Sequence, residues 1–241
     1  MRVYRSFSWK DTNLRVACAS FELVTRTVVE ARRQLERYIA RHPPFRTALE
    51  PLPLLDDPPE AARRMAAAAE LTGLGPMAAV AGTLAQLGAE AALASSCAEA
   101  IVENGGDIFL VATAPVTIAI HAGAALGNRL AFHIDPHQTP LALCSSSGTM
   151  GHSLSLGRCD LATVASRDAS LADAAATLVG NLVRRERDLT PALERVGAIP
   201  GIDGILAVVG GRIGLWGQLP PLVSNKDAAT GAKITRDLQA G

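Results

Sequence analysis

The sequence predicts an α+β protein in which mixed or antiparallel sheets pack against helices. Segments typical of strands follow one another in series and are joined by hairpin signals. The segments with helical periodicity are grouped between them and do not alternate with single strands, as a regular βαβ array would require. With 241 residues, of which 49% are apolar, the chain is long enough for one large core. We therefore expect a single domain over residues 1–241, with a flexible tail at 225–241.

The elements are predicted from local patterns along the chain. The dipeptide of Asn104 and Gly105 and the pair of Gly210 and Gly211 are hairpin turns between β-branched runs. Strands are expected at 2–9, 14–23, the two halves of 100–111, 115–121, 129–134, 160–166 and the two halves of 204–217. Helices are expected at about 28–41, 58–70, 77–94 and 171–187.

Two of these helices carry specific signals at their ends and on their surfaces. The first is expected to stop at Pro43 and Pro44, and its arginines indicate a solvated face or, as the alternative, a surface for a phosphate-bearing ligand. In the second, Asp57 and Glu60 flank a proline in a pattern typical of a capping box. The small residues of 61–69 allow packing between subunits, hence a homo-oligomer, or an ordinary intramolecular contact.

Charge and composition limit the function classes. Lys plus Arg and Asp plus Glu both number 23, so no overall field attracts nucleic acid or an anionic membrane. The uncharged runs at 71–89 and 108–128 contain polar or β-branched residues and are interpreted as buried elements of a soluble protein. The N-terminal residues lack an apolar signal segment, and the four dispersed cysteines indicate reduced thiols. We expect a cytoplasmic protein that binds small molecules.

The stretch 144–177 contains the main candidate for metal binding. Asp173 and Thr177 are four residues apart on a predicted helix, so they share a face, and their oxygens suit Mg²⁺ or Ca²⁺. The alternative is a capping box between Ser170 and Asp173, in which the carboxylate satisfies backbone donors only. The pattern alone leaves both interpretations open.

Two small-residue segments are candidates for ligand binding. The glycine turn of Glu103 to Asp107 lets a ligand approach, or forms an ordinary hairpin with exposed polar flanks. The segment Ser145–His152 offers hydroxyl and N–H groups to a phosphate but lacks the lysine of a P-loop. His152 is an acid/base or a structural histidine, and Cys144 is a reactive or a buried thiol. Ser147, His152 and Asp107 also supply the residue types of a catalytic triad, but their spacing does not require one.

The order of these motifs resembles a known family. GLGPMAAVAG, VENGGDIFL, SSSGTMGHSLSLGRCDLATV and LADAAAT follow one another, after a YI-x3-PPF segment at 38–45. On these motifs the chain resembles an uncharacterised family of the ApbE-like superfamily from about Val3 to Gly217. The resemblance implies an ApbE-like, T-fold-like architecture. It also implies the superfamily's named activity, FAD:protein FMN transferase, which moves FMN from FAD to a Ser or Thr hydroxyl with the help of Mg²⁺.

The resemblance implies FAD or FMN and Mg²⁺ as cofactors. It places the metal at Asp173 and Thr177, with a backbone carbonyl near Met77 or Ala78. The expected flavin or nucleotide contacts are Asn104, Gly105, Gly106, Asp107, Ser146, Ser147, Gly148, Thr149 and His152. The chain departs from the transferase pattern in two places, because GPMAAVAG contains no lysine and GTMGH replaces a loop with an aromatic residue.

Three functions are consistent with these patterns. The first is a protein that binds a flavin or related nucleotide with a divalent metal, with or without flavin transferase activity. The second is a sulfur-assimilation protein with a persulfide on Cys144 beside His152, since the resembled family has been associated with sulfide assimilation. The third is a non-catalytic binding protein that has kept the pocket.

Overall fold

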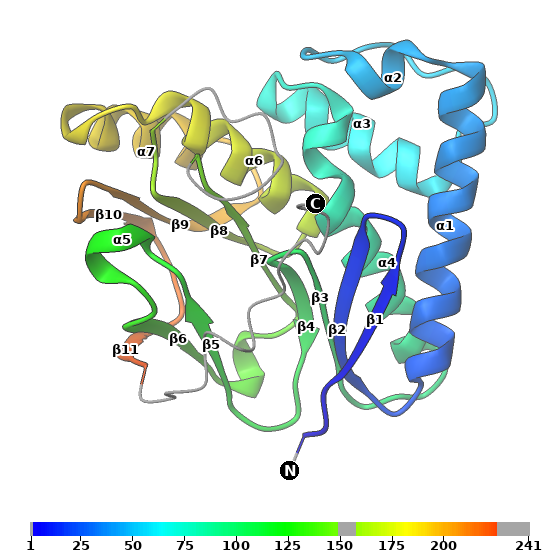
Figure 1. The fold of residues 1–241 in the computed structure, drawn as a ribbon, viewed down its shortest axis with the longest axis horizontal. Coiled ribbons are helices and arrows are strands. Elements are labelled where there is room, and N and C mark those ends of the chain that lie inside the picture. The colour runs from blue at the N-terminus through cyan, green and yellow to red at the C-terminus, as the bar shows by residue number, and fades with distance from the viewer. Residues whose placement is uncertain (1, 149–157, 226–241) are drawn as a thin grey trace.

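The computed structural model describes residues 2–148 and 158–225, which form two antiparallel sheets and a layer of helices (Figure 1). The larger sheet has eight strands in the order β1-β2-β3-β4-β7-β8-β9-β10. They are β1 (Arg5–Trp9), β2 (Thr12–Cys18), β3 (Ala100–Asn104), β4 (Asp107–Val111), β7 (Leu141–Ser146), β8 (Leu161–Ser166), β9 (Ile202–Val209) and β10 (Arg212–Gly217). The smaller sheet has the order β11 (Leu222–Ser224), β6 (Leu130–Ile134) and β5 (Val116–Ile120).

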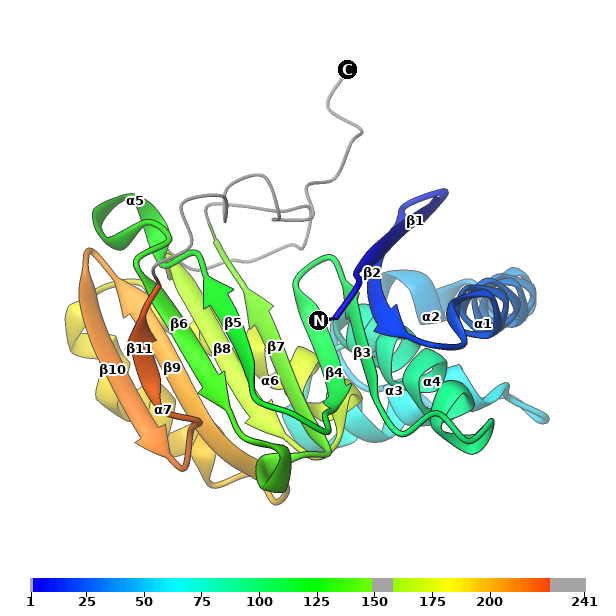
Figure 2. The ribbon, with the colours of Figure 1, turned by 90° about the horizontal axis from the view of Figure 1, so that it is seen from below.

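Apart from the short α5, which connects β5 and β6, the helices lie on the side of the larger sheet opposite the smaller sheet (Figure 2). The helices are α1 (Phe21–Arg41), α2 (Pro44–Thr47), α3 (Glu60–Thr72), α4 (Val80–Ala94), α5 (Gly123–Leu126), α6 (Ala169–Leu182) and α7 (Leu189–Gly197). Three short 3₁₀ turns complete the described elements: η1 (Pro76–Ala79), η2 (Pro136–Gln138) and η3 (Glu186–Asp188). The predicted α+β class with antiparallel sheets is confirmed.

Alternating side chains divide the core between the two faces of the larger sheet. Val102 and Phe109 face α4 and α6, whereas their neighbours Ile101 and Leu110 face the smaller sheet and Phe132. Successive side chains of a strand point to opposite faces, so both faces of these central strands must be apolar. Both hairpins predicted from turn dipeptides, Asn104–Gly105 and Gly210–Gly211, are present, in β3–β4 and in β9–β10.

Several predicted boundaries are wrong. Helix α1 begins at Phe21, inside the segment 14–23 expected to be a strand, because Phe21 and Val24 are buried on its inner face. The residues at 144–146 belong to β7 and not to a loop, and the helix expected at 171–187 spans Ala169–Leu182. Strand β7, helix α7, strand β11 and the short helices α2 and α5 were not predicted.

The capping box predicted at Asp57 and Glu60 is also absent. Helix α3 has Pro59 at its N-cap and no side-chain cap, while Glu60 accepts hydrogen bonds from Arg63 and Arg64. The small residues of α3 pack inside the chain, against Tyr38, Phe45 and α6. An intramolecular contact therefore accounts for them, and they no longer support a homo-oligomer.

Among the described residues, one helical stretch is long and apolar enough to cross a membrane by length and composition alone. It is Pro76–Ala94, with a mean hydropathy of 1.3. In the structure this stretch packs against α1, α6 and β3, and Leu84, Ala85 and Ala89 are buried. Its packing is that of a core helix, as expected from the sequence for the run at 71–89.

Two of the arginines of α1 form ion pairs with carboxylates. Arg32 bonds to Asp11 at 2.6 Å, and Arg37 lies 3.1 Å from Glu30. Because pairs at exposed positions contribute little stability, they mainly keep this face soluble. The arrangement agrees with the solvated-face interpretation.

Candidate functional site

The β3–β4 hairpin presents two polar side chains to the helical layer. Asn104 and Asp107 are paired across the turn of Gly105 and Gly106, whose φ values of 64° and 105° favour glycine. By strand alternation both polar side chains lie on the same face as Val102 and Phe109. The predicted hairpin is therefore present, but its aspartate is 6% exposed and is not an exposed flank.

Asp107 is held between the sheet and the helices. Its Oδ1 accepts a hydrogen bond of 3.1 Å from the backbone N–H of Ser145 on β7. Burial and the nearby carboxylate of Asp173 raise the pKa of Asp107 well above its usual value, and the two hydrogen-bonding partners, Ser145 N–H and the Cys144 thiol, offset only part of that effect. Two carboxyl groups from different elements thus share one desolvated site.

Asp173 comes from α6 and faces the beginning of α4. Its Oδ2 accepts a hydrogen bond of 2.9 Å from the N–H of Gly82, and the N–H of Ala81 also donates to it. These amides belong to the first turn of α4, where unpaired N–H groups and the helix dipole favour an anion. Burial nevertheless raises the pKa of Asp173 to about 7, since the residue is only 9% exposed.

The close approach of α4 and α6 depends on a glycine. A Cβ atom at Gly82 would lie 2.2 Å from the carbonyl oxygen of Ala169 and 2.9 Å from the Cβ of Asp173. Any larger residue would separate the helices and withdraw the amide from the carboxylate. This glycine was not singled out in the sequence, where the only signal was the run of small residues in GPMAAVAG.

Asp173 does not form the predicted capping box with Ser170. The N-cap of α6 is Asp168, whose side chain accepts from the N–H groups of Ser170 at 2.8 Å and Leu171 at 3.3 Å. The Ser170 hydroxyl instead accepts from Thr83 of α4 at 2.8 Å. The carboxylate of Asp173 lies in the second turn of α6 and serves the N-terminus of a different helix.

The carboxylates of Asp107 and Asp173 have no cationic partner in residues 2–148 and 158–225. Neither forms an ion pair with a lysine, arginine or histidine there, although both are buried. A buried carboxylate without such a partner either takes up a proton or binds a cation. We call this pair the carboxylate cluster.

Oxygen atoms around the carboxylate cluster suit a hard cation. Thr177, one turn beyond Asp173 on α6, is half-buried, and its hydroxyl forms no hydrogen bond with the described residues. Ser146, at the end of β7, has a buried Oγ without a partner among them. The described residues contain no group of three or more His, Cys, Asp and Glu side chains placed for a metal. Two carboxylates completed by hydroxyl, carbonyl or ligand oxygens match the preference of Mg²⁺.

Part of the backbone near the carboxylate cluster is already hydrogen-bonded. The side-chain amide of Asn104 donates to the carbonyl of Ala81 at 3.1 Å, which ties the hairpin to α4. Met77 and Ala78, whose carbonyls were proposed as metal ligands, lie in η1, which packs against α6. The structure therefore brings η1, α4, α6 and the hairpin together, while the metal ligands stay a prediction.

The second predicted ligand segment begins at the end of β7. Ser147 donates through its hydroxyl to the carbonyl of Asp160 at 2.8 Å, and Gly148 donates through its N–H to the carbonyl of Cys159 at 2.9 Å. Both contacts anchor the segment to the chain that enters β8. Thr149 and His152 lie outside the described residues. The structure does not support the catalytic triad, because the Ser147 hydroxyl donates to the backbone carbonyl of Asp160.

Cys144 is a buried thiol. It is fully enclosed under α6, with its sulfur 3.5 Å from the carbonyl oxygen of Ala169. Burial, and then the carboxylates of Asp107 and Asp173, raise the pKa of Cys144 well above its usual value. A nucleophilic thiol needs access and a lowered pKa, so the structure argues against a persulfide carrier at this position.

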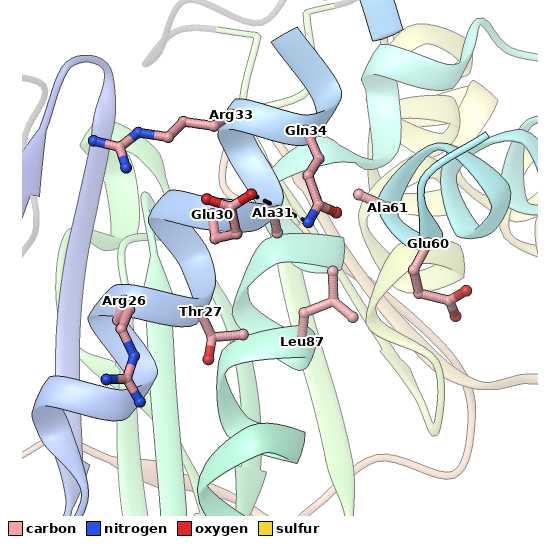
Figure 3. A pocket seen from close by; sticks show the side chains of 9 residues that line it. All are labelled: Arg26, Thr27, Glu30, Ala31, Arg33, Gln34, Glu60, Ala61 and Leu87. Atoms are coloured by element: carbon pink, nitrogen blue, oxygen red, sulfur yellow. Dashed lines mark hydrogen bonds between the residues drawn. The ribbon is translucent and has the colours of Figure 1, made fainter. Parts of the chain in front are cut away.

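A separate pocket lies on the helical side, away from the carboxylate cluster. It has a volume of about 610 Å³ and is lined by α1, α3 and Leu87 of α4. Figure 3 shows Leu87 between the side chains of α1 and Glu60 of α3. The carboxylates of this pocket are paired, Glu30 with Gln34 and Arg37, and Glu60 with Arg63 and Arg64. Both carboxylates are therefore neutralised within the described residues and need no cation.

Known proteins show the same fold and give the family. Residues 5–200 match the family model described as "AbpE bacteria". UPF0280 proteins from Methanocella arvoryzae and Methanosphaerula palustris are 43% and 41% identical, over 82% and 90% of this chain and 80% and 92% of their own. The flavin transferase ApbE from Vibrio cholerae has a TM-score of 0.58 at 14% identity, covering 90% of this chain and 96% of its own.

Another solved structure agrees with this result. The apo form of the flavinyl transferase ApbE from Pseudomonas stutzeri has a TM-score of 0.60 at 14% identity, covering 93% of this chain and 95% of its own. At this level of identity the likeness concerns the fold alone. The family rests on the matched model and on the close relatives: the chain belongs to the UPF0280 proteins, an ApbE-like family.

Proposed function

We propose that this protein binds FAD, FMN or a related nucleotide together with Mg²⁺ at the carboxylate cluster, and that it acts as a flavin transferase. The observation that carries the proposal is the pair of buried carboxylates, Asp107 and Asp173, without a cationic partner among the described residues. The two solved flavin transferases with this fold support the choice of ligand. A cytoplasmic location is part of the proposal and is supported by four free cysteines.

In this proposal the chain supplies oxygen ligands and hydrogen bonds at fixed positions. Asp173 and Thr177 hold the metal, and the Gly82 amide keeps the Asp173 carboxylate oriented. Ser146 directs its unbonded hydroxyl to the ligand, and the glycine turn lets a ring or phosphate approach the backbone. When bound, Mg²⁺ neutralises phosphate charge and polarises the phosphoryl group for transfer. Phosphoryl transfer depends on this positioning and neutralisation.

Metal binding is tested without any nucleotide. We expect Mg²⁺ to raise the thermal unfolding midpoint of the wild-type protein over that in chelator, because it binds the folded state only. Asp173→Asn is expected to lose this shift. Asp168→Asn is the matched control, since asparagine is also a good N-cap and Asp168 lies on the same helix away from the metal. A shift that persists in Asp173→Asn would contradict the proposed ligand.

Ligand binding and transfer are tested in two further steps. Titration with FAD, FMN and ATP, with and without Mg²⁺, is expected to show metal-dependent binding, and no binding of any of them would refute the proposal. Transfer of FMN from FAD to a hydroxyl leaves AMP, so release of AMP from FAD in the presence of acceptor protein measures the reaction.

A second candidate, binding without transfer, is favoured by one observation. The segment Gly75–Gly82, which enters α4 beside the carboxylate cluster, contains no lysine. Without that positive charge less of the charge on the phosphates is neutralised. Tight, Mg²⁺-dependent binding of FAD without AMP release would support this candidate over the transferase.

A further inference from the structure

Two thiols meet at the turn between β2 and α1, far from the carboxylate cluster. Cys18 is the last residue of β2 and is paired with Ala100, the first residue of β3, whereas Asn104 of the carboxylate cluster's hairpin is at the other end of β3. Cys97 lies just before β3. The Cys97 sulfur lies 3.1 Å from the hydroxyl oxygen of Ser20, which is two positions after Cys18, and both cysteines line one pocket, so the two thiols are neighbours.

These two cysteines differ from the other two in accessibility. Cys18 and Cys97 are half-buried, whereas Cys144 and Cys159 are fully enclosed. Cys18 and Cys97 also line a pocket of about 340 Å³, which is large enough for a small molecule. Of the four thiols, only this pair has a route to a ligand in solution.

The surroundings distinguish the two sulfurs. The hydroxyl of Ser20, 3.1 Å from the Cys97 sulfur, is the main cause of a lowered pKa of Cys97, and the N–H groups of Ser20 and Ala19 act in the same direction. Ser20 is the N-cap of the 21-residue helix α1, so the helix dipole also favours a thiolate there. Burial raises the pKa of the Cys18 thiol.

We propose that Cys97 and Cys18 form a thiol–disulfide exchange site for low-molecular-weight disulfides, with Cys97 as the attacking thiol and Cys18 as the resolving thiol. The thiolate of Cys97 attacks one sulfur of the small disulfide, the S–S bond breaks, and one small thiolate leaves. Cys18 then loses its proton to solvent and attacks the Cys97 sulfur, which releases the second small thiolate and forms the Cys18–Cys97 disulfide. The two protein thiols are oxidised and one disulfide is reduced to two thiols.

This pair is distinct from Cys144, the buried thiol of the persulfide alternative. The pocket beside the thiols is lined by Arg2 and Glu99, which are bonded to each other at 2.6 Å. Because these two charges pair with each other and the rest of the lining besides the thiols is apolar, the pocket selects no charge on the small disulfide. The site requires neither Mg²⁺ nor a flavin, so it stands or falls independently of the proposed function.

The test treats the reduced full-length protein with hydroxyethyl disulfide and follows intact mass and peptide maps. We expect the wild type to lose two hydrogens and to contain a Cys18–Cys97 disulfide. Cys18→Ser is expected to stop at a stable mixed disulfide on Cys97, because no thiol resolves it. Cys97→Ser is expected to react at least ~10-fold more slowly, since the remaining half-buried thiol, Cys18, has a raised pKa.

Cys144→Ser, judged folded by circular dichroism, is the matched control and is expected to react as the wild type does. The proposal is overturned if the wild type keeps a mixed disulfide on Cys97, does not react, or forms disulfides between molecules only. It is overturned equally if Cys97→Ser reacts at the wild-type rate. Folding of the Cys18→Ser and Cys97→Ser variants is checked by their thermal midpoints. A variant that fails this check is replaced by the single alanine variant at the same position, Cys18→Ala or Cys97→Ala.

Discussion

The buried carboxyl group of Asp173 makes the stability of the metal-free protein depend on pH. Its folded pKa of about 7 lies above its usual value of 3.8, so the folded state holds the proton more tightly than the unfolded state. The stabilisation that this bound proton gives the folded state is complete below the unfolded pKa and is lost as the pH rises through the folded pKa. Asp173→Asn cannot ionise, and its amide oxygen can still accept from Gly82. Relative to wild type, we expect it to gain up to ~4 kcal/mol between about pH 4 and about pH 8.

Urea unfolding of both proteins in chelator, at a series of pH values, measures this difference. Asp168→Asn is the control, because Asp168 is an N-cap at the surface end of the same helix. If Asp173→Asn and wild type showed parallel pH profiles, the carboxylate would have to be compensated by a group outside the described residues.

The hydroxyl of Ser146 provides a second prediction for a single residue. Its Oγ is buried without a partner among the described residues, so Ser146→Ala removes no hydrogen bond from them. We expect the variant to be as stable as wild type or ~1 kcal/mol more stable, since an unsatisfied buried polar group carries a cost. If the hydroxyl binds the nucleotide, affinity for FAD falls at the same time. Unfolding and titration of the same preparation separate the two effects, and a clear loss of stability would show that Ser146 has a structural partner.

For single residues, the sequence identified candidate site residues but not their burial or their hydrogen-bond partners. The spacing of Asp173 and Thr177 identified a shared helix face, and ENGGD identified a hairpin. The burial of Asp107 depends on the pairing of β4 with β7 and on the packing of α6, neither of which a local pattern contains. The hydrogen-bond donor to Asp173 is the backbone N–H of Gly82, 91 positions away in the chain. Because almost every residue type has a backbone N–H, the sequence gives no sign of such a donor.

Among the elements, the crossing of α4 and α6 places both groups of the carboxylate cluster. Gly82→Ala would put a Cβ atom 2.2 Å from the carbonyl oxygen of Ala169, so the helices must move apart. We expect a loss of about 1–3 kcal/mol in stability, as for overpacking elsewhere. We also expect the loss of the thermal shift produced by Mg²⁺, because the Asp173 carboxylate loses its fixed donor.

Gly88→Ala is the matched control for the same helix. A Cβ there meets the side chains of Val28 and Val24 on α1 at 2.9 and 3.0 Å, on the face away from α6. It is expected to lower stability through the α1–α4 contact while keeping the Mg²⁺ response. Loss of the response in both variants would mean that metal binding depends on overall stability and not on the α4–α6 crossing.

Elements whose structure depends on neighbouring residues in the chain were predicted correctly, and those that depend on distant contacts were not. The two hairpins were predicted because a two-residue turn specifies its own geometry. Strand β7 was not predicted: its last three residues, Cys144, Ser145 and Ser146, have weak strand propensity, and pairing with β4 and β8 overrides it. The cap of α6 was misplaced by two residues: Asp168 and Ser170 are both good N-caps, and the packing of Ser170 against Thr83 decides between them.

For the whole molecule, the sequence predicted the class and left the strand order open. Local patterns give strands and helices, but the order β4-β7-β8-β9 requires that β5 and β6 leave the larger sheet and form a second one with β11. That separation depends on contacts between distant segments, such as Phe132 of β6 with the face of the larger sheet. The expectation of a single domain over the chain stays a prediction and has a direct test.

The two tryptophans test whether the fold unfolds as one unit, because they lie in the opposite edge strands of the larger sheet. Trp9 is in β1, and Trp216 is in β10, where it packs against Gly197 of α7. In Trp9→Phe and Trp216→Phe, each with one remaining tryptophan, we expect urea unfolding by fluorescence to coincide with unfolding by far-ultraviolet circular dichroism. Comparing the two signals within one variant removes the effect of the substitution on stability. A fluorescence midpoint from Trp9 that precedes the circular dichroism midpoint would show that the β1–β2 hairpin, held by one strand neighbour, unfolds separately from the sheet that carries the carboxylate cluster.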